Sequence, residues 1–252
     1  MKNVNSFFSE NNTVRELSEG DLKQIFDYVK VIDAFSITSN QSIYVIDYEK
    51  KGFDYVSTNP LFLNGHTPTE VLEMGYEFYF KYVPDKELDL LLKINTIGFE
   101  FYDKVPEAER KLYSIAYDFH IKTQDEKLIL INQKLTPMFM TEKGKLWKAL
   151  SIVSLSTNQN VGNITVSKSG ENKTRVYDLD NNVWTEQFKT ELSEREVEIL
   201  QLSMRGHSIS EVGERLFISS DTVKFHRRKI YEKLEVNNIS EAILIANNLQ
   251  LI

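Results

Sequence analysis

Apolar and polar residues alternate with a period of two in the middle of the chain. Over residues 113–122, tyrosine, isoleucine and phenylalanine occupy every second position, as in a strand with one buried face. Two further strand-like runs, residues 127–140 and 146–155, follow after short polar turns. Parallel strands need crossovers of a dozen or more residues, so strands joined by such short turns must be antiparallel. The pattern predicts an antiparallel meander.

The residues before this meander show both the strand period of two and the helical period of about 3.6. Helical spacing of apolar positions predicts a helix over residues 20–34. Residues 42–48 and 53–58 are strand-like and are joined by the turn EKKG, which predicts a hairpin. A second, longer helix is expected to begin at Asp85, and the aromatic residues between positions 76 and 82 are interpreted as core.

A compact helix is predicted between these elements, within residues 65–76. Thr67 is its expected N-cap, Pro68 its first residue and Glu70 the partner that completes a capping box. Together, these patterns give the order strand, strand, helix, helix, strand, strand, strand.

The C-terminal end of the chain predicts four short helices. Serine at an N-cap with glutamate three residues later opens each of the first two, and the third, from Ser219 or Ser220 to about Leu234, carries most of the positive charge. The fourth begins near Ile239. Two short helices joined by a tight turn form the helix-turn-helix arrangement. The capping pairs are Ser193 with Glu196 and Ser208 with Glu211.

A helical wheel divides the third helix into two sides. Val223, Ile230, Leu234 and His226 fall on the side expected to face the core. Residues 221–231 hold four cations and one anion, and concentrated positive charge is what contact with phosphates requires. The groove-facing side carries Asp221, Lys224, Phe225 and Arg228, with Thr222 and Lys229 on one flank and Arg227 and Tyr231 on the other.

Charge and aromatic content change near residue 192. The net charge of −7 divides into −6 before residue 192 and −1 after it, and 26 of the 29 aromatic residues lie in the first part. We therefore expect two domains rather than one. Residues 158–190 are rich in asparagine, glycine, serine and lysine, and we interpret them as a linker that carries a short hairpin.

The sequence lacks the residues and motifs that several classes of chemistry require. The chain has no cysteine, which excludes disulfides, zinc fingers and iron–sulfur clusters. His66 and His120 do not form a spaced pair, and the expected helix after Asp85 has no histidine for a haem, so no metal and no cofactor is predicted. None of the nucleophile-elbow, P-loop or dinucleotide-binding motifs occurs. We expect no enzymatic activity.

Residues 35–157 resemble a PAS domain. The resemblance rests on the element order and on the phrase FDYVSTNPLFLNGHTPTEVLEMGYEFYFKYVPDKELDLLLK, in which VSTN, HTPTEVL and VPD match parts of the PAS pattern. It implies an antiparallel sheet with flanking helices that senses a signal or mediates dimerisation. A receiver domain alternates strands and helices, and the three successive strands contradict that order.

The stretch LSEREVEILQLSMRGHSISEVGERLFISSDTVKFHRRKIYEKLEV resembles the LuxR/GerE-type helix-turn-helix domain. This resemblance implies a dimer that places the third helix in the major groove of DNA. Gly213 stands where the family usually has alanine, and Glu235 where glycine is common. The residues expected to contact DNA are Lys224, Phe225 and Arg228 at bases, with Thr222, Arg227, Lys229 and Ser208 beside them.

The sequence predicts an α+β chain in four parts. An N-terminal helical extension spans residues 1–34, a PAS-like domain 35–157, a linker 158–190 and an all-α four-helix LuxR-type domain 191–252. The expected function is sequence-specific transcriptional regulation by a cytoplasmic homodimer on double-stranded DNA, with no membrane contact. Control by a partner protein rather than a small ligand, or an enzyme joined to a PAS domain, are the alternatives.

Overall fold

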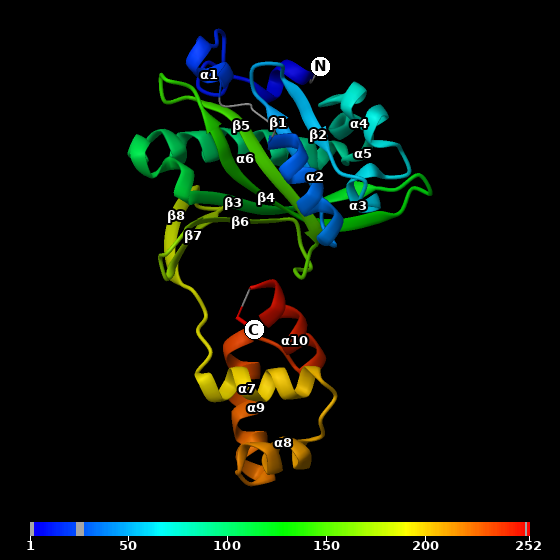
Figure 1. Ribbon diagram of the computed structural model, residues 1–252, viewed down its shortest axis with the longest axis vertical. Helices are drawn as coiled ribbons and strands as arrows, with labels where there is room; N and C mark the ends of the chain where they lie inside the picture. The colour runs from blue at the N-terminus through cyan, green and yellow to red at the C-terminus, as the bar shows by residue number, and fades with distance from the viewer. Residues whose placement is uncertain (1–2, 24–27, 250) are drawn as a thin grey trace. The chain divides into compact units, whose positions relative to one another are not determined.

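The computed structural model describes residues 3–23, 28–249 and 251–252 and divides into two compact units (Figure 1). The first unit is Met1–Gln187 and the second is Phe188–Ile252. Each has its own hydrophobic core. No helix within the described ranges is long and apolar enough to cross a membrane.

The first unit is built on one eight-stranded sheet with the order β2-β1-β5-β4-β3-β6-β7-β8. The pairings that join β1 to β7 are all antiparallel, which confirms the predicted meander of β3, β4 and β5 and contradicts a receiver domain. The strands are β1 (Ser42–Asp47), β2 (Gly52–Val56), β3 (Tyr113–Lys122), β4 (Leu128–Met140), β5 (Leu146–Leu155), β6 (Gly162–Lys168), β7 (Lys173–Asp178) and β8 (Val183–Phe188).

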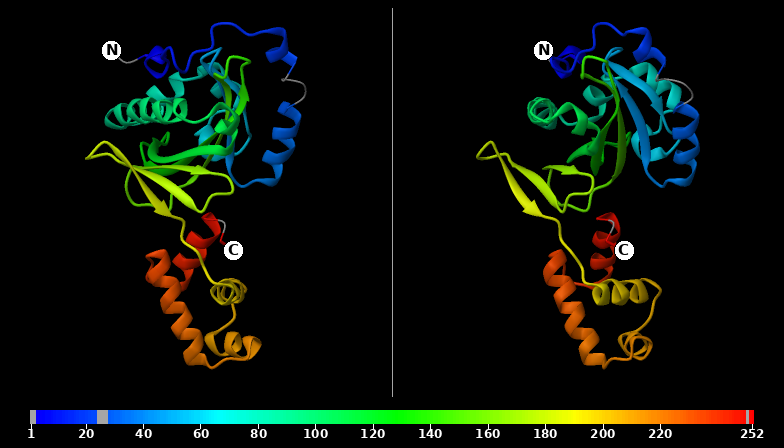
Figure 2. Two further views of the ribbon diagram at one scale, coloured as in Figure 1. Left: turned by 90° about the vertical axis from the view of Figure 1, so that its left-hand side faces the viewer. Right: turned by 60° about the vertical axis from the view of Figure 1, so that its left-hand side comes forward.

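Helices cover both faces of this sheet (Figures 1 and 2). The long helix α6 packs on one face, and α2 packs on the other face against β1 and β2. The order of strands and helices is the one that the PAS resemblance implies. The helical elements are η1 (Val4–Phe7), α1 (Glu19–Lys23), α2 (Tyr28–Thr38), α3 (Pro60–Leu63), α4 (Pro68–Met74), α5 (Glu77–Tyr82), α6 (Asp85–Asp103) and η2 (Glu107–Leu112).

The helices agree with the sequence patterns in part. Thr67 caps α4 and forms the predicted capping box with Glu70. The short helices α3 and α5 were not predicted, because their few residues do not display a helical period. The helix predicted over residues 20–34 falls partly on residues 24–27, which lie outside the described residues, and α2 continues past its predicted end to Thr38.

The segment predicted as a linker belongs largely to the sheet. Strand β6 pairs with β3, β7 pairs with β6, and β8 is the last strand of the sheet. The expected short hairpin is present as β6 and β7, but residues 158–190 are not a linker for most of their length. The buried carboxylate of Asp118 accepts amide hydrogen bonds from Asn132, Asn158 and Asn163 at 2.6–2.8 Å. These bonds hold the segment around Asn158 and Asn163 against the sheet, although its polar composition predicts a solvent-exposed linker.

Alternate residues of β1 serve two different cores. Tyr44 and Ile46 face α6 in the larger core, while Ile43 and Val45 pack with Ile32 of α2 on the opposite face. The alternation is the consequence of the strand period and explains why every residue of β1 is buried. The sheet therefore has no solvent-facing side at β1.

A buried ion group lies on the face that α2 covers. The ammonium of Lys148 on β5 lies 2.5 Å from Asp47 and 2.8 Å from Asp54, and the lysine and Asp47 are almost completely buried. The hydroxyl of Tyr28 donates to Asp54 and so connects α2 to this group. One cation between two carboxylates compensates charges that burial would otherwise make very costly.

The second unit contains four helices around a small apolar core. Val223, Ile230 and Leu234 are buried, as the helical wheel predicted, whereas His226 is half-buried. The serine capping boxes of α7 and α8 are both present, and Ser219 and Asn238 cap the next two helices. The helices are α7 (Glu194–Met204), α8 (Ile209–Leu216), α9 (Ser220–Leu234) and α10 (Ile239–Asn248).

The turn between α8 and α9 explains one departure from the family pattern. Phe217 ends α8 in the left-handed conformation with φ 55°, and the N–H of Ile218 donates to the carbonyl of Gly213 at 2.9 Å. A Cβ atom at Gly213 would lie 2.8 Å from the carbonyl oxygen of Ile218. Glycine therefore permits the close approach of this turn. Glu235, where the family commonly has glycine, ends α9 with φ 54°.

Candidate DNA-binding surface and N-terminal cavity

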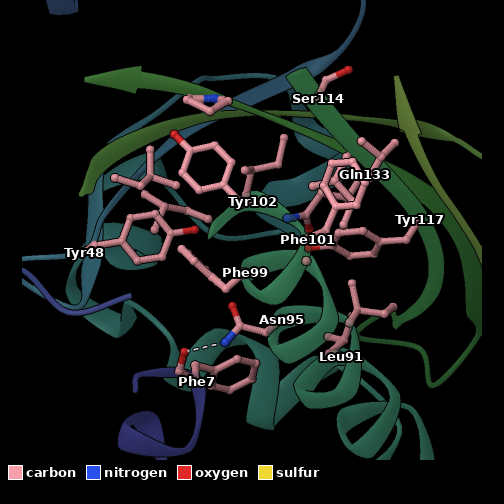
Figure 3. Close-up of a pocket in the computed structure, with 18 of the residues that line it drawn as sticks. Phe7, Tyr48, Leu91, Asn95, Phe99, Phe101, Tyr102, Ser114, Tyr117 and Gln133 are labelled. Carbon is pink, nitrogen blue, oxygen red and sulfur yellow. Dashed lines mark hydrogen bonds between the residues drawn. The ribbon is translucent and has the colours of Figure 1, made fainter. Parts of the chain in front are cut away.

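A cavity of about 90 Å³ lies in the first unit between the sheet and α6 (Figure 3). Its walls come from α5, α6 and five strands, and they include Tyr48, Asn95, Phe101, Tyr117 and Gln133. No charged side chain is among the described residues that line it. Of the aromatic residues that the sequence assigned to the core, Tyr76 and Tyr79 also line this cavity, which periodicity alone could not show.

Hydroxyl and amide groups supply the polarity of the cavity. Burial raises the pKa values of Tyr48, Tyr76, Tyr79 and Tyr117, so these hydroxyls stay protonated and are hydrogen-bond donors. The hydroxyl of Tyr79 also donates to Gln133 at 3.5 Å. An apolar wall with a few convergent polar groups is the usual composition of a small-molecule site.

The N-terminal segment closes one side of the cavity. The ring of Phe7 packs 5.0 Å from Tyr76 and is buried. Its carbonyl oxygen accepts hydrogen bonds from Asn95 at 2.7 Å and from Asn12 at 2.6 Å (Figure 3). Because Asn95 belongs to α6 and lines the cavity, the position of this segment depends on a cavity residue.

The two histidines of the first unit have local partners. His66 lies within hydrogen-bonding distance of the Tyr82 hydroxyl, and Nδ1 of His120 lies 2.8 Å from the carboxylate of Glu87 on α6. Among the residues that the structure describes, no three histidine, aspartate or glutamate side chains are grouped to hold a metal.

The exposed face of α9 carries the positive charge of the second unit. Lys224, Phe225, Arg228 and Lys229 are all exposed. The ammonium of Lys224 lies 3.0 Å from Asp221, an exposed pair of small energetic consequence. The wheel placed Lys224, Phe225 and Arg228 on the groove-facing side and Lys229 on a flank, and all four are exposed.

Three other expected contact residues have partners within the unit. The hydroxyl of Thr222 lies 2.9 Å from that of Ser219, and the Ser208 hydroxyl caps α8. Arg227 turns toward α7 and donates to the Ser203 hydroxyl at 2.8 Å, while its Nε is buried without a partner. The wheel placed Arg227 on a flank but could not show that its guanidinium bonds another helix.

Residues 190–246 match the family model of bacterial regulatory proteins of the luxR family. The second unit is a LuxR-family domain. It is therefore the DNA-binding part of a transcriptional regulator.

Three similar proteins match different shares of the chain. The oxygen regulatory protein NreC of Staphylococcus aureus is 25% identical over 178 residues, which cover 67% of this chain and 78% of the relative. The response regulator ChrA of a heme-sensing two-component system is 44% identical over 26% of this chain and 33% of its own, with a TM-score of 0.25. A phage VqmA–DPO complex is 16% identical and covers 90% of this chain and 89% of its own, with a TM-score of 0.33.

A charged contact joins the C-terminal end of α9 to α7 in the LuxR-family domain. Lys233 of α9 lies 2.7 Å from the buried carboxylate of Glu196 on α7, which also accepts from the Ser193 N–H. Burial acts to raise the pKa of Glu196, but these donors outweigh it and the pKa is lowered. The sequence identified Glu196 as a capping residue and missed its contact with α9.

We expect Glu196→Gln to destabilise the LuxR-family domain at neutral pH by about 1–2 kcal/mol. The pKa of Glu196 is lower in the folded state, so its contribution is complete above the unfolded value of about 4.3 and disappears as pH falls through the folded pKa. Thermal unfolding of a fragment of residues 188–252, followed by circular dichroism between pH 7 and pH 3, measures this. The variant and the wild type should converge at the acid end.

Glu198→Gln is the matched control for this measurement. Glu198 lies on the same helix but is exposed, in a pair with Arg195 at 2.8 Å. If Glu198→Gln lowers the stability of the fragment at pH 7 as much as Glu196→Gln does, the Glu196–Lys233 contact has no specific role.

Proposed function

We propose that this chain is a cytoplasmic, homodimeric regulator of transcription that binds specific DNA sequences through α9 and responds to a small molecule held in the N-terminal cavity. The observation that carries the proposal is the exposed cationic face of α9 within a LuxR-family domain. We assign no enzymatic step to the chain, since the family consists of regulators.

The proposed contacts divide between bases and phosphates. Lys224, Phe225 and Arg228 lie on the exposed face and are assigned to base edges in the major groove. Thr222 and Lys229 on the flank of α9, and Ser208 at the N-cap of α8, are assigned to the DNA backbone. Arg227 joins this second group when its guanidinium leaves Ser203 for a phosphate oxygen.

We expect Lys224→Ala or Arg228→Ala to reduce discrimination at single base pairs by about 1–3 kcal/mol, because each removes a donor to a base edge. Arg227→Ala should weaken all duplexes about equally and reduce the salt dependence of binding, since a phosphate contact carries no sequence information. Fluorescence anisotropy titrations with a selected duplex and its single-base variants, at two salt concentrations, measure both effects.

Ser203→Ala separates the two roles of Arg227. This variant removes the contact of Arg227 with α7 and leaves the guanidinium in place. It should bind DNA as the wild type does.

A binding constant of the wild type that does not change between low and physiological salt would contradict the proposed surface.

The cavity is proposed to take an uncharged molecule of about one ring. Its volume of about 90 Å³ is smaller than the apolar cavity of about 150 Å³ that is known to admit benzene, so one ring is the upper limit of size. Tyrosine hydroxyls and the Gln133 amide provide hydrogen bonds, but no lining side chain provides an opposite charge for an ionised ligand.

We expect phenol to bind the cavity saturably and benzoate, a one-ring molecule that carries a carboxylate, to bind at least about tenfold more weakly, because the cavity has no cation to pair with a carboxylate. Ligand-detected NMR with the full chain measures both. Gln133→Leu should weaken phenol binding, and Leu128→Ala, an exposed site elsewhere on the sheet, should leave it unchanged. Equal affinity for the two probes would contradict the assignment.

An exposed apolar surface on α2 supports the dimer. Val31 and Phe35, one turn apart on α2, have exposed fractions of 70% and 53%, although Ile32 of the same helix is buried against the sheet. Large apolar side chains gathered on a protein surface commonly mark an interface. A second copy of this chain is the partner proposed for it, and a different protein partner is the alternative that the oligomeric state tests.

A further inference from the structure

Phe225 is the one apolar side chain among the cations of the α9 face. It has an exposed fraction of 48% and does not belong to the apolar core that the buried residues of α9 share. Its neighbours on this face are Lys224 and Arg228, and Lys229 lies on the adjoining flank. In the free protein, the ring therefore contributes little burial and remains largely in water.

Two contacts orient this ring. The ammonium of Lys229, one turn further along, lies 4.7 Å from the ring centroid, and the ring of His226 meets it edge-on at 5.7 Å. A cation placed over an aromatic face is attracted by the ring quadrupole. The side chain is therefore positioned before any ligand arrives.

The major groove offers one prominent apolar group to such a ring. Adenine, guanine and cytosine present donors and acceptors there, whereas thymine also presents its C5-methyl group. A phenyl ring satisfies no donor or acceptor, and covering one would remove a polar base edge from water without a replacement. The methyl group of thymine is the feature that the ring can cover favourably.

We propose that Phe225 is a specificity-determining residue that recognises the C5-methyl group of a thymine in each half-site. This inference rests on the proposed function and deepens it. Lys224 and Arg228 supply hydrogen bonds to the neighbouring bases, and Phe225 selects thymine between them by apolar contact. Lys229, held over the ring, remains on the side of the helix assigned to the backbone.

The test removes the methyl group and nothing else. The full chain first selects duplexes from a random library, and each thymine of the best duplex is then replaced singly by deoxyuridine, which retains every hydrogen-bonding group. Burying one methyl group contributes an amount equivalent to about a fourfold change in affinity. We expect the replacement of one thymine per half-site to weaken binding by about this factor. At the other thymines, the ratio of thymine to uracil affinities should be close to one.

Variants of residue 225 assign the effect to the ring. In Phe225→Ala, the ratio of thymine to uracil affinities at that position should fall to about one, and Phe225→Leu, which is apolar, should retain most of it. Lys224→Ala should lower overall affinity and leave the ratio intact. Circular dichroism of each variant establishes that α9 is folded.

Two outcomes overturn the inference while the proposed function stands. One is a selected duplex that tolerates deoxyuridine at every position, and the other is a methyl effect that persists in Phe225→Ala. Failure to enrich any duplex would instead overturn the proposed function itself.

Discussion

Replacing Lys148 by methionine is expected to lower the free energy of unfolding of the N-terminal unit by about 3–5 kcal/mol. The ammonium lies between Asp47 and Asp54, and both it and Asp47 are almost completely buried. Methionine has a similar length but no charge, so the buried carboxylate of Asp47 would lose its cation, and Asp54 would keep only its contact with the exposed ammonium of Lys50 at 2.8 Å. Removing one member of a buried ion group costs far more than removing an exposed pair.

Urea unfolding followed by tryptophan fluorescence measures this loss. Both tryptophans of the chain, Trp147 and Trp184, lie in the first unit, so their emission reports on that unit alone. The double variant Lys148→Met with Asp47→Asn is the control, because it removes one charge of each sign. The amide oxygen of the introduced asparagine can still accept from the backbone N–H groups of Glu49 and Lys50, as the carboxylate of Asp47 does.

The double variant should recover most of the stability that the single variant loses. An equal loss in both variants would show that the lysine acts through packing rather than through its charge. A loss below about 1 kcal/mol in the single variant would contradict the buried ion group altogether.

The parts of the fold that sequence predicted are those with local causes. The meander of β3, β4 and β5 follows from a period of two and short turns, and α4, α7 and α8 follow from capping boxes written in adjacent residues. The inward side of α9 was predicted for the same reason, because burial of Val223 and Ile230 repeats with the helical period.

The remaining features depend on residues that are distant in the chain. Strand β6 joins the sheet because Asp118, some forty residues earlier, binds the asparagines of a polar segment. The Lys148 group unites three strands, and the cavity combines α5 and α6 with five strands. No local pattern in the sequence contains these contacts.

The candidate DNA-binding site divides in the same way. The exposed set of Lys224, Phe225 and Arg228 could be predicted from the wheel together with the family resemblance. The partner of Arg227 could not be predicted from the wheel. Ser203 belongs to another helix, and a wheel describes only one helix.

A fragment of residues 188–252 is expected to be monomeric and to bind a selected duplex at least about a hundredfold more weakly than the full chain. One recognition helix contacts only a few bases, each worth about 1–3 kcal/mol of discrimination. Loss of a second half-site with two such contacts removes about 2–6 kcal/mol, and the middle of this range exceeds the roughly 2.7 kcal/mol that corresponds to about a hundredfold in affinity. The fragment retains its own core, so it can fold without the first unit.

Sedimentation velocity and anisotropy titrations on the same duplex measure the oligomeric state and the affinity of both proteins. In the full chain, Phe35→Glu places a charge on the exposed surface of α2 and should produce a monomer with the weak affinity of the fragment. Leu128→Glu, at a position with a similar exposed fraction of 55%, is the matched control and should remain dimeric. Fusing the fragment to a dimeric coiled coil should restore much of the affinity, because dimerisation supplies the second half-site. Equal mass and equal affinity for the fragment and the full chain would show that the first unit does not act through dimerisation.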